Sequence, residues 1–186
     1  MRYVYRTSRV VQGTLLSLVL TAVGFFAGCG GEPLDVTSEL LVTDVTTGWF
    51  DSGIQPDGRN KLVPEVSFQL KNGAQNRISI VSVMGVFRVL EDVQELGSST
   101  VRAIRTEGLP AGDLTQPIVM RARLGYASTE PRLQMLQHRL FVDAKVELFA
   151  KHRGSQWVPI GEYVIDRQLL TNCILRPLQA GVFAVK

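Results

Sequence analysis

A strict alternation of apolar and polar residues in two segments constrains the fold of this chain more than any other feature. Residues 64–70 read PEVSFQL, and the apolar members Val66, Phe68 and Leu70 occupy every second position. Residues 138–152 repeat the pattern, with an apolar face formed by Val142, Ala144, Val146 and Leu148. Because successive side chains of a strand point to opposite faces, both segments are predicted to be strands with one apolar face that packs on a second layer.

Further strand and turn signals follow along the chain. Segments rich in β-branched residues predict strands at residues 39–47, 77–91, 99–105, 117–124 and 157–169. We expect Asn72-Gly73 to supply a positive φ in the turn at 71–76, and a bulge near Gly85. The only helix of note is predicted at 130–138. The sequence therefore predicts an all-β protein, an antiparallel sandwich of about seven strands, with a closed barrel as the alternative.

The amino-terminal residues have the organisation of a targeting signal. Arg2, Arg6 and Arg9 are the only charged residues before Glu32, and residues 10–27 are mostly apolar. A basic start, an apolar run and small residues at its end are typical of a secretory signal peptide. The uncharged run of about 18 residues is also just long enough to cross a bilayer. Because this run contains several polar residues and no Lys or Arg directly follows it, we favour a signal peptide over an uncleaved anchor or a buried helix.

The four residues Phe26-Ala27-Gly28-Cys29 at the end of this run resemble the lipobox of bacterial lipoproteins. The resemblance implies a diacylglyceryl thioether on Cys29, cleavage before this residue and acylation of the new amino terminus. Two or more acyl chains hold a protein stably on a membrane. Gly30, in place of Asp, implies outer-membrane export by analogy with enteric bacteria. We therefore expect a lipid-anchored protein of the cell envelope, on the outer membrane and facing the periplasm.

The charge balance changes once the predicted signal peptide, residues 1–28, is removed. Loss of three arginines leaves 17 Lys and Arg against 17 Asp and Glu, so the formal net charge falls from +3 to zero. Without a basic excess to neutralise phosphates, we expect no nucleic-acid partner. The remaining chain suits one domain of ordinary size. We expect a tether at 29–38, a sandwich domain at 39–170 and a tail at 171–186, whose Cys173 has no internal disulfide partner if Cys29 is lipidated.

Two resemblances support an immunoglobulin-like sandwich. Residues 66–87, VSFQLKNGAQNRISIVSVMGVF, resemble the hairpin of FxLYD-type and late-embryogenesis-type domains, in which an apolar strand ends in a Lys-Asn turn. Residues 45–72 and 129–152 are similar to a group of uncharacterised bacterial lipoproteins. The resemblance covers most of residues 39–170. It implies an immunoglobulin-like sandwich and no particular reaction.

The sequence contains few of the patterns that catalysis requires. A Gly-x-Ser-x-Gly nucleophile elbow is absent, and no glycine-rich phosphate loop precedes a helix. The only histidines, His138 and His152, are predicted at opposite ends of one strand, too far apart to share a metal ion. We therefore expect no cofactor, no metal and no enzymatic activity. A pair of carboxylates for glycoside hydrolysis stays an alternative, because the sequence does not show the distance between two carboxylate groups.

Exposed aromatic residues are the strongest candidates for a contact surface. Trp49 and Phe50 are neighbours, so on a strand one of them would face outward, and Tyr126 lies in a predicted loop. In the alternative interpretation, Trp49 plugs the open end of the sandwich. We expect a non-catalytic, membrane-anchored module that binds other envelope proteins. The alternative function, a carrier of lipid or another hydrophobic ligand, requires an internal cavity of several hundred Å³.

Overall fold

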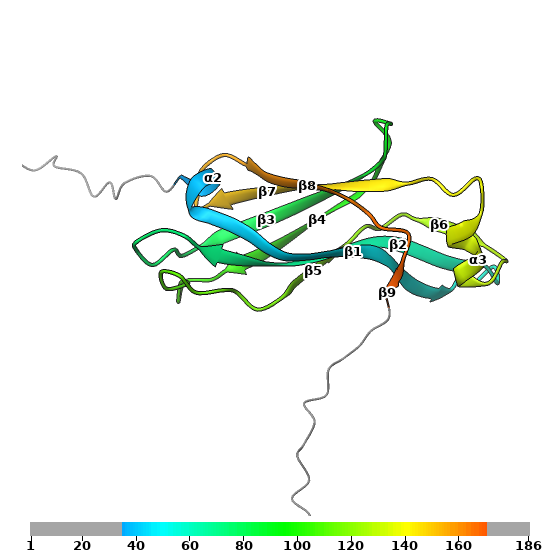
Figure 1. Ribbon diagram of the computed structural model, residues 1–186, viewed down its shortest axis with the longest axis horizontal. Helices are drawn as coiled ribbons and strands as arrows, with labels where there is room; N and C mark the ends of the chain where they lie inside the picture. Colours follow the sequence, from blue (N-terminus) through cyan, green and yellow to red (C-terminus); the bar gives the residue numbers. More distant parts are fainter. Residues whose placement is uncertain (1–34, 171–186) are drawn as a thin grey trace, which may run out of the picture. The chain divides into compact units, whose positions relative to one another are not determined.

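A computed structural model describes residues 35–170 of the chain, and these residues form two β-sheets packed face to face (Figure 1). The first sheet has the strand order β5-β2-β1-β9, with β6 also paired to β2. Its strands are β1 (Leu40–Ile54), β2 (Asn60–Asn72), β5 (Ile118–Arg121), β6 (Tyr126–Ser128) and β9 (Leu169–Leu170). The second sheet has the order β4-β3-β7-β8. Its strands are β3 (Val81–Val89), β4 (Glu95–Ile104), β7 (Ala144–His152) and β8 (Val158–Val164).

The strand order confirms the predicted all-β sandwich. The first sheet holds β1, β2 and β5, and the second holds β4, β3, β7 and β8, which is the distribution of strands A, B, E and C′, C, F, G in an immunoglobulin-like fold. Apart from β9, which pairs with β1 in parallel, all paired strands of the described region are antiparallel. Two separate sheets, each ending in edge strands, exclude the closed barrel.

Two short helices accompany the sheets. Helix α3 (Arg132–Gln137) confirms the helix predicted at 130–138. Helix α2 (Val36–Glu39) is a single turn whose first backbone N–H groups are capped by Asp35. Val36 is buried in the core, so the packed domain already includes a residue from the range predicted as tether.

The apolar core is built by the alternating residues that the sequence singles out. Val66, Phe68 and Leu70 of β2 are fully buried, as are the three strand residues Ala144, Val146 and Leu148 of β7. Val142 was predicted on the same face, but it is 50% exposed because β7 begins only at Ala144. Val142 lies in the connection between α3 and β7, so the strand alternation begins later than the sequence predicts.

The bulge predicted near Gly85 is wrong. Gly85 pairs in unbroken register with Leu148 of β7, and the bulges of the adjacent ladder lie in β4, at Leu96 and Ala103. Gly85 lies on the inner face of β3, and a Cβ built on it would be in ordinary van der Waals contact with the sulfur of Met120 on β5, at 3.4 Å. Met120 thus packs closely over this glycine in the space between the two sheets.

Asn72 also has a different role from the predicted one. The predicted positive φ is not found at Asn72 or Gly73; instead Asn72 is fully buried at the end of β2. Its side-chain amide donates to the carbonyl oxygens of Asn76 and Leu109, at 2.9 and 2.8 Å, and its oxygen accepts from the Ala74 N–H at 2.9 Å. This one side chain thus fixes the 73–80 connection against the long loop before β5.

The chain crosses from the second sheet to the first directly after β8, which the continuous strand predicted at 157–169 did not anticipate. The Thr47 hydroxyl donates to the Val164 carbonyl and accepts from the Asp166 N–H, at 3.0 and 3.1 Å. Arg167 then binds both carboxylate oxygens of Asp143, at 2.6 and 2.9 Å, and this bond lowers the pKa of Asp143 more than burial raises it. These contacts position β9 beside β1.

Replacement of Asn72 by alanine is expected to lower the free energy of unfolding by about 2–4 kcal/mol, because buried backbone groups lose their partners. Urea denaturation of the native chain and the variant measures this difference. Asn76→Ala is the matched control, since Asn76 is exposed, and should change stability by less than about 0.5 kcal/mol. Equal effects of the two substitutions would contradict the role assigned to Asn72.

Replacement of Asp143 by asparagine should destabilise the fold only at pH values at which the native carboxylate is ionised. The folded pKa of Asp143 is depressed, so its stabilisation is present above the unfolded pKa of about 3.9 and is lost as pH falls through the folded value. Because the ion pair is partly exposed, the expected loss at pH 7 is at most about 1 kcal/mol. Urea unfolding at pH 7 and pH 2.5 tests this. Exposed Asp113→Asn is the control and should show no such pH-dependent difference.

Candidate functional site: an edge groove

The three aromatic residues predicted as a contact surface do not form one surface. Trp49 is 2% exposed, and its ring packs edge-on against Phe141, with centroids 4.6 Å apart. Half-buried Tyr126 contacts the same phenylalanine at 5.1 Å. The indole Nε1 of Trp49 is buried without a hydrogen-bond partner among residues 35–170, so packing alone holds the ring. Trp49 therefore occupies the position of the alternative interpretation, an aromatic plug.

Phe50 points to the opposite, outer face of the first sheet, where it is only partly exposed. The Arg121 guanidinium lies over its ring at 3.5 Å and forms an ion pair with Glu65, the cross-strand neighbour of Arg121. Leu170 covers nearby Gly48, since a Cβ on that glycine would lie 2.6 Å from the Leu170 Cγ. The outer surface around Phe50 is thus already occupied by side chains of the same chain.

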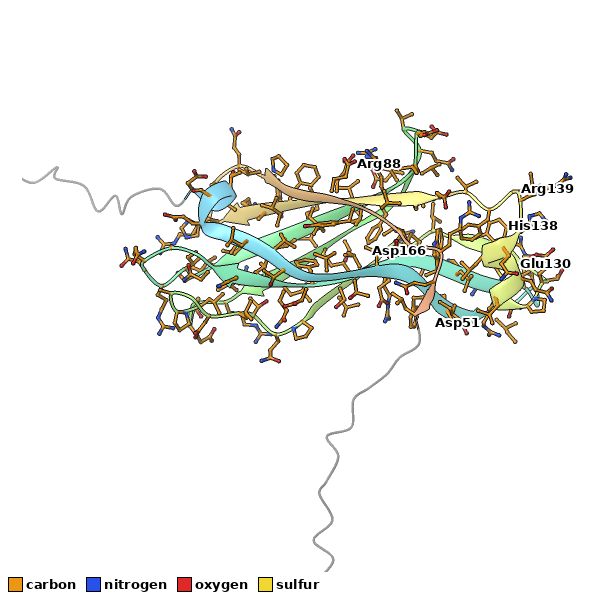
Figure 2. The ribbon with its side chains drawn as sticks, viewed as in Figure 1. Asp51, Arg88, Glu130, His138, Arg139 and Asp166 are labelled. Atoms are coloured by element: carbon orange, nitrogen blue, oxygen red, sulfur yellow. The ribbon has the colours of Figure 1, made fainter. Side chains whose placement is uncertain are left out.

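The residue after Phe50 ties this region to α3, at one end of the sandwich (Figure 2). Asp51 forms an ion pair with Arg132 and accepts a hydrogen bond from the Gly53 N–H at 2.9 Å. Partial burial raises the pKa of Asp51, but the hydrogen bonds from Arg132 and Gly53, with the charge of Arg132, outweigh it and lower the pKa. This ionised aspartate serves to hold the end of β1.

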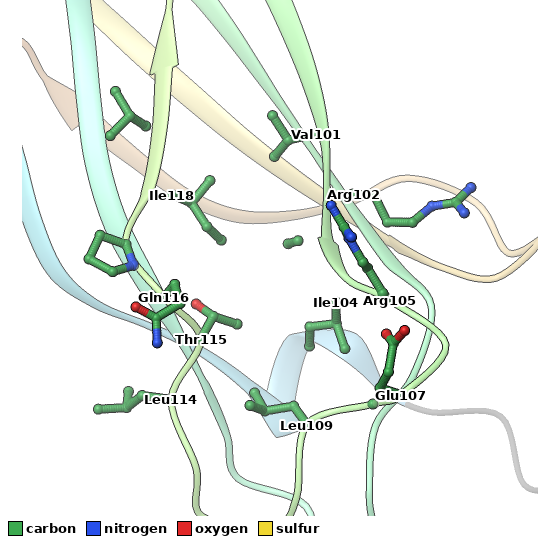
Figure 3. Close-up of a pocket in the computed structure, with 14 residues that line it drawn as sticks. Val101, Arg102, Ile104, Arg105, Glu107, Leu109, Leu114, Thr115, Gln116 and Ile118 are labelled. Atoms are coloured by element: carbon green, nitrogen blue, oxygen red, sulfur yellow. The ribbon is translucent and has the colours of Figure 1, made fainter.

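A more open site lies between the free edges of the two sheets. A groove of about 510 Å³ separates β4, the edge of the second sheet, from the segment leading into β5, the edge of the first (Figure 3). Residues 101–105, 107–109 and 114–119 line it. We call this feature the edge groove.

The inner face of β4 carries short side chains beside β3. Val101, Ser99 and Gly97 pair with Val83, Gly85 and Phe87 of β3, whose inner face is buried. At Gly85 the neighbour on the other side is the larger Leu148 of β7, and at Phe87 it is Val146. The packing is therefore thinner on the β4 side at these two positions.

Backbone hydrogen bonds close the edge groove at both ends. At one end, the Leu124 N–H donates to the Leu96 carbonyl at 2.9 Å. At the other end, Leu109 and Ile78 exchange two hydrogen bonds, of 2.7 and 3.0 Å, and the Ile80 N–H donates to the Arg105 carbonyl. The groove is thus a bounded gap between two fixed edges.

The edge groove has an apolar floor and a charged rim. Val101, Ile104, Leu109 and Ile118 supply the apolar side chains (Figure 3). Arg102, Arg105 and Glu107 are exposed charged residues of the same lining. Within residues 35–170, neither arginine forms an ion pair. An apolar floor with unpaired cations at its rim suits an amphipathic ligand or peptide.

A second cavity, of about 660 Å³, lies between α3 and the segment before β9. Leu133, Leu136, Gln137, Arg167, Gln168 and Leu169 line it. Arg167 is already engaged by Asp143. We therefore take the edge groove as the candidate site.

The sequence did not reveal the edge groove, although a signal was present. The run GSSTVRA, residues 97–103, holds small residues at alternate positions of a predicted strand. Small residues weaken a central strand, so their presence favours an edge position. The groove itself depends on which strands pair, and no local pattern shows that.

Several other predicted features fall outside the described residues. The lipidation residue Cys29 and the tail with Cys173 both lie there. Within residues 35–170, no group of three or more His, Cys, Asp or Glu residues is placed to hold a metal ion. The helices of this region are too short to span a membrane.

Comparison with known proteins gives no family for the chain. No family model and no curated protein matches it. Among solved structures, it is similar to an X-ray structure of the Northeast Structural Genomics Consortium target SoR45, with 10% identity over 76% of this chain and 93% of that one and a TM-score of 0.39. It is also similar to the putative ApaA protein from Bordetella pertussis, with 14% identity over 68% and 92% and a TM-score of 0.38. Neither similarity is strong enough to support a functional conclusion.

Proposed function

We propose that the chain is a lipid-anchored protein of the bacterial cell envelope that binds another envelope protein and has no catalytic role. The basic start, the apolar run and the lipobox-like residues ending at Cys29 support the anchor. The neutral charge balance of the remaining chain supports a protein partner over nucleic acid. No interaction with a cofactor is part of this proposal.

The edge groove is the observation that carries the binding role. It is an open site beside β4, whose outer edge pairs with no other strand, and such edges are used for recognition of extended peptides. The groove lies at the surface, whereas the space between the sheets is filled by Met120 close against Gly85. A carrier that shields a hydrophobic ligand needs an enclosed cavity, so the geometry favours a protein partner.

The carrier function remains the second candidate because the groove floor is apolar. Val101, Ile104 and Ile118 could contact an acyl chain, leaving its other side in water. Native mass spectrometry of the chain purified in mild detergent separates the two functions. A bound small molecule of constant mass supports the carrier, and its absence supports protein binding.

Replacement of Cys29 by serine is expected to abolish acylation, because serine lacks the sulfur that forms the thioether. The native chain should sediment with membranes, and its amino-terminal peptide should carry the added mass of the lipid. The variant should lose this mass; if it is exported and processed, it should leave the membrane fraction. Cys173→Ser, which removes the other cysteine, is the matched control and should leave anchoring unchanged. A native chain that begins at Met1 without added mass would refute the anchor.

Binding is expected to be visible in the intact envelope. After mild crosslinking of cells, the tagged chain should purify with one protein in near-constant ratio. The Cys29→Ser chain should recover less of it, because it is no longer held at the same membrane. Recovery of the monomer alone, under conditions that preserve known envelope complexes, would contradict the binding role.

A further inference from the structure

Between two bulges, the outer edge of β4 pairs with no other strand, although Arg123 lies close to Gly97 at one end, where a Cβ on the glycine would be 3.1 Å from the Arg123 nitrogen. In the order of the second sheet, β4 pairs only with β3, so every second residue directs its N–H and C=O groups away from the sheet. The bulges at Leu96 and Ala103 bound this stretch, residues 97–102, which contains neither proline nor a carboxylate. The opposite edge strand, β8, carries Pro159 at a bulge, a feature that protects edges from pairing.

A strand added to this edge would reach one end of the edge groove, whose lining shares Val101 and Arg102 with the free stretch. Neighbouring strands lie about 4.8 Å apart, and their side chains alternate between the two faces of the sheet. One set of side chains of the added strand would therefore enter the groove above Val101 and Ile118. This floor requires apolar residues at every second position of the partner segment.

The charge at the rim indicates which residues the partner segment should carry at its other alternate positions. Arg102 and Arg105 are exposed and form no ion pair within the described region. Arg77 lies beside them, since it donates to the carbonyls of Glu107 and Gly108 at 2.9 and 3.2 Å. The lining itself holds two arginines against the single carboxylate of Glu107, a net charge of +1, and Arg77 adds a positive charge next to it. Carboxylates on a partner would complement it.

We propose that β4 and the edge groove bind an extended segment of a protein partner by strand addition. The segment has apolar residues at alternate positions and acidic residues that face Arg102 and Arg105. This inference rests on the proposed function, because it names the kind of segment that the binding module recognises. Main-chain hydrogen bonds supply affinity, while the groove and the arginines supply specificity.

Three synthetic peptides test the proposal against the full chain purified in detergent. The first is a fluorescent seven-residue peptide of alternating aspartate and valine. The second replaces each aspartate by lysine, and the third keeps aspartate and valine but carries N-methyl groups on alternate backbone nitrogens. Fluorescence anisotropy should show saturable binding of the first peptide. The lysine and N-methyl peptides should bind at least about tenfold more weakly, because each lacks one component of the recognition.

Charge reversal at the rim provides the matched variants. Arg102→Glu combined with Arg105→Glu should weaken the aspartate peptide at least about tenfold and strengthen the lysine peptide. Arg59→Glu and Arg139→Glu together make the same change in charge at exposed positions outside the groove lining and should have no such effect. Thermal unfolding of all variants checks that the fold is intact.

Hydrogen exchange locates the bound peptide. Addition of the aspartate peptide should slow exchange of amides in residues 97–103 and leave those of β8 unchanged. Equal binding of the aspartate and lysine peptides, undiminished binding of the N-methyl peptide, or protection of β8 would overturn the proposal.

Two further outcomes identify where an error lies. If the aspartate peptide does not bind, but vesicles of phosphatidylglycerol and phosphatidylcholine bind the Cys29→Ser chain through Arg102 and Arg105, the rim contacts lipid and the strand-addition proposal is wrong. If the crosslinked envelope complex persists in the charge-reversed variant and the peptide does not bind, the proposed function stands and this inference fails. Loss of the complex together with the peptide supports both.

Discussion

The contact between the inner faces of the two sheets is the constraint on which the other features of this structure depend. Met120 of β5 reaches the space above Gly85 of β3, and Leu148 of β7 closes the same region. Fully buried Phe68 and Phe87 extend this core from the two sheets. Apolar burial of this kind is the main favourable contribution to folding, so the distance between the sheets is set here.

The edge groove follows from the way this core ends. Opposite Gly85, β7 contributes Leu148 and β4 contributes Ser99, so the packing is full on one side of β3 and thin on the other. The backbone hydrogen bonds at Leu96 and Leu109 keep the edges joined where the side chains do not. The edge groove thus shares the buried residues Ile104 and Leu109 with the core, while its rim is exposed.

The sequence predicted features that depend on which face of a strand is buried, but not features that depend on contacts with distant residues. The alternation at Val66, Phe68 and Leu70 was sufficient to predict β2 and its buried face, because burial of one face imposes period two. Gly85 and Asn72 were misassigned because their local signals, a bulge and a turn, are weaker than the distant contacts that actually fix them, Met120 and Leu109. The edge groove lies between β4 and the segment leading into β5, and its shape depends on how the two sheets place these segments, which no local sequence pattern shows.

The proposed anchor and the proposed site constrain one another through chain length. Only residues 30–34 separate Cys29 from the cap of α2, and an extended chain of this length reaches at most about 20 Å. Helix α2 lies at the same end of the sandwich as Leu109. The Glu39 carbonyl accepts a hydrogen bond from the Gly73 N–H, and the side chain of the adjacent Asn72 donates to the Leu109 carbonyl. One end of the edge groove would thus stay near the lipid surface. With this anchor, the proposed partner segment would meet Arg102 and Arg105 close to the membrane.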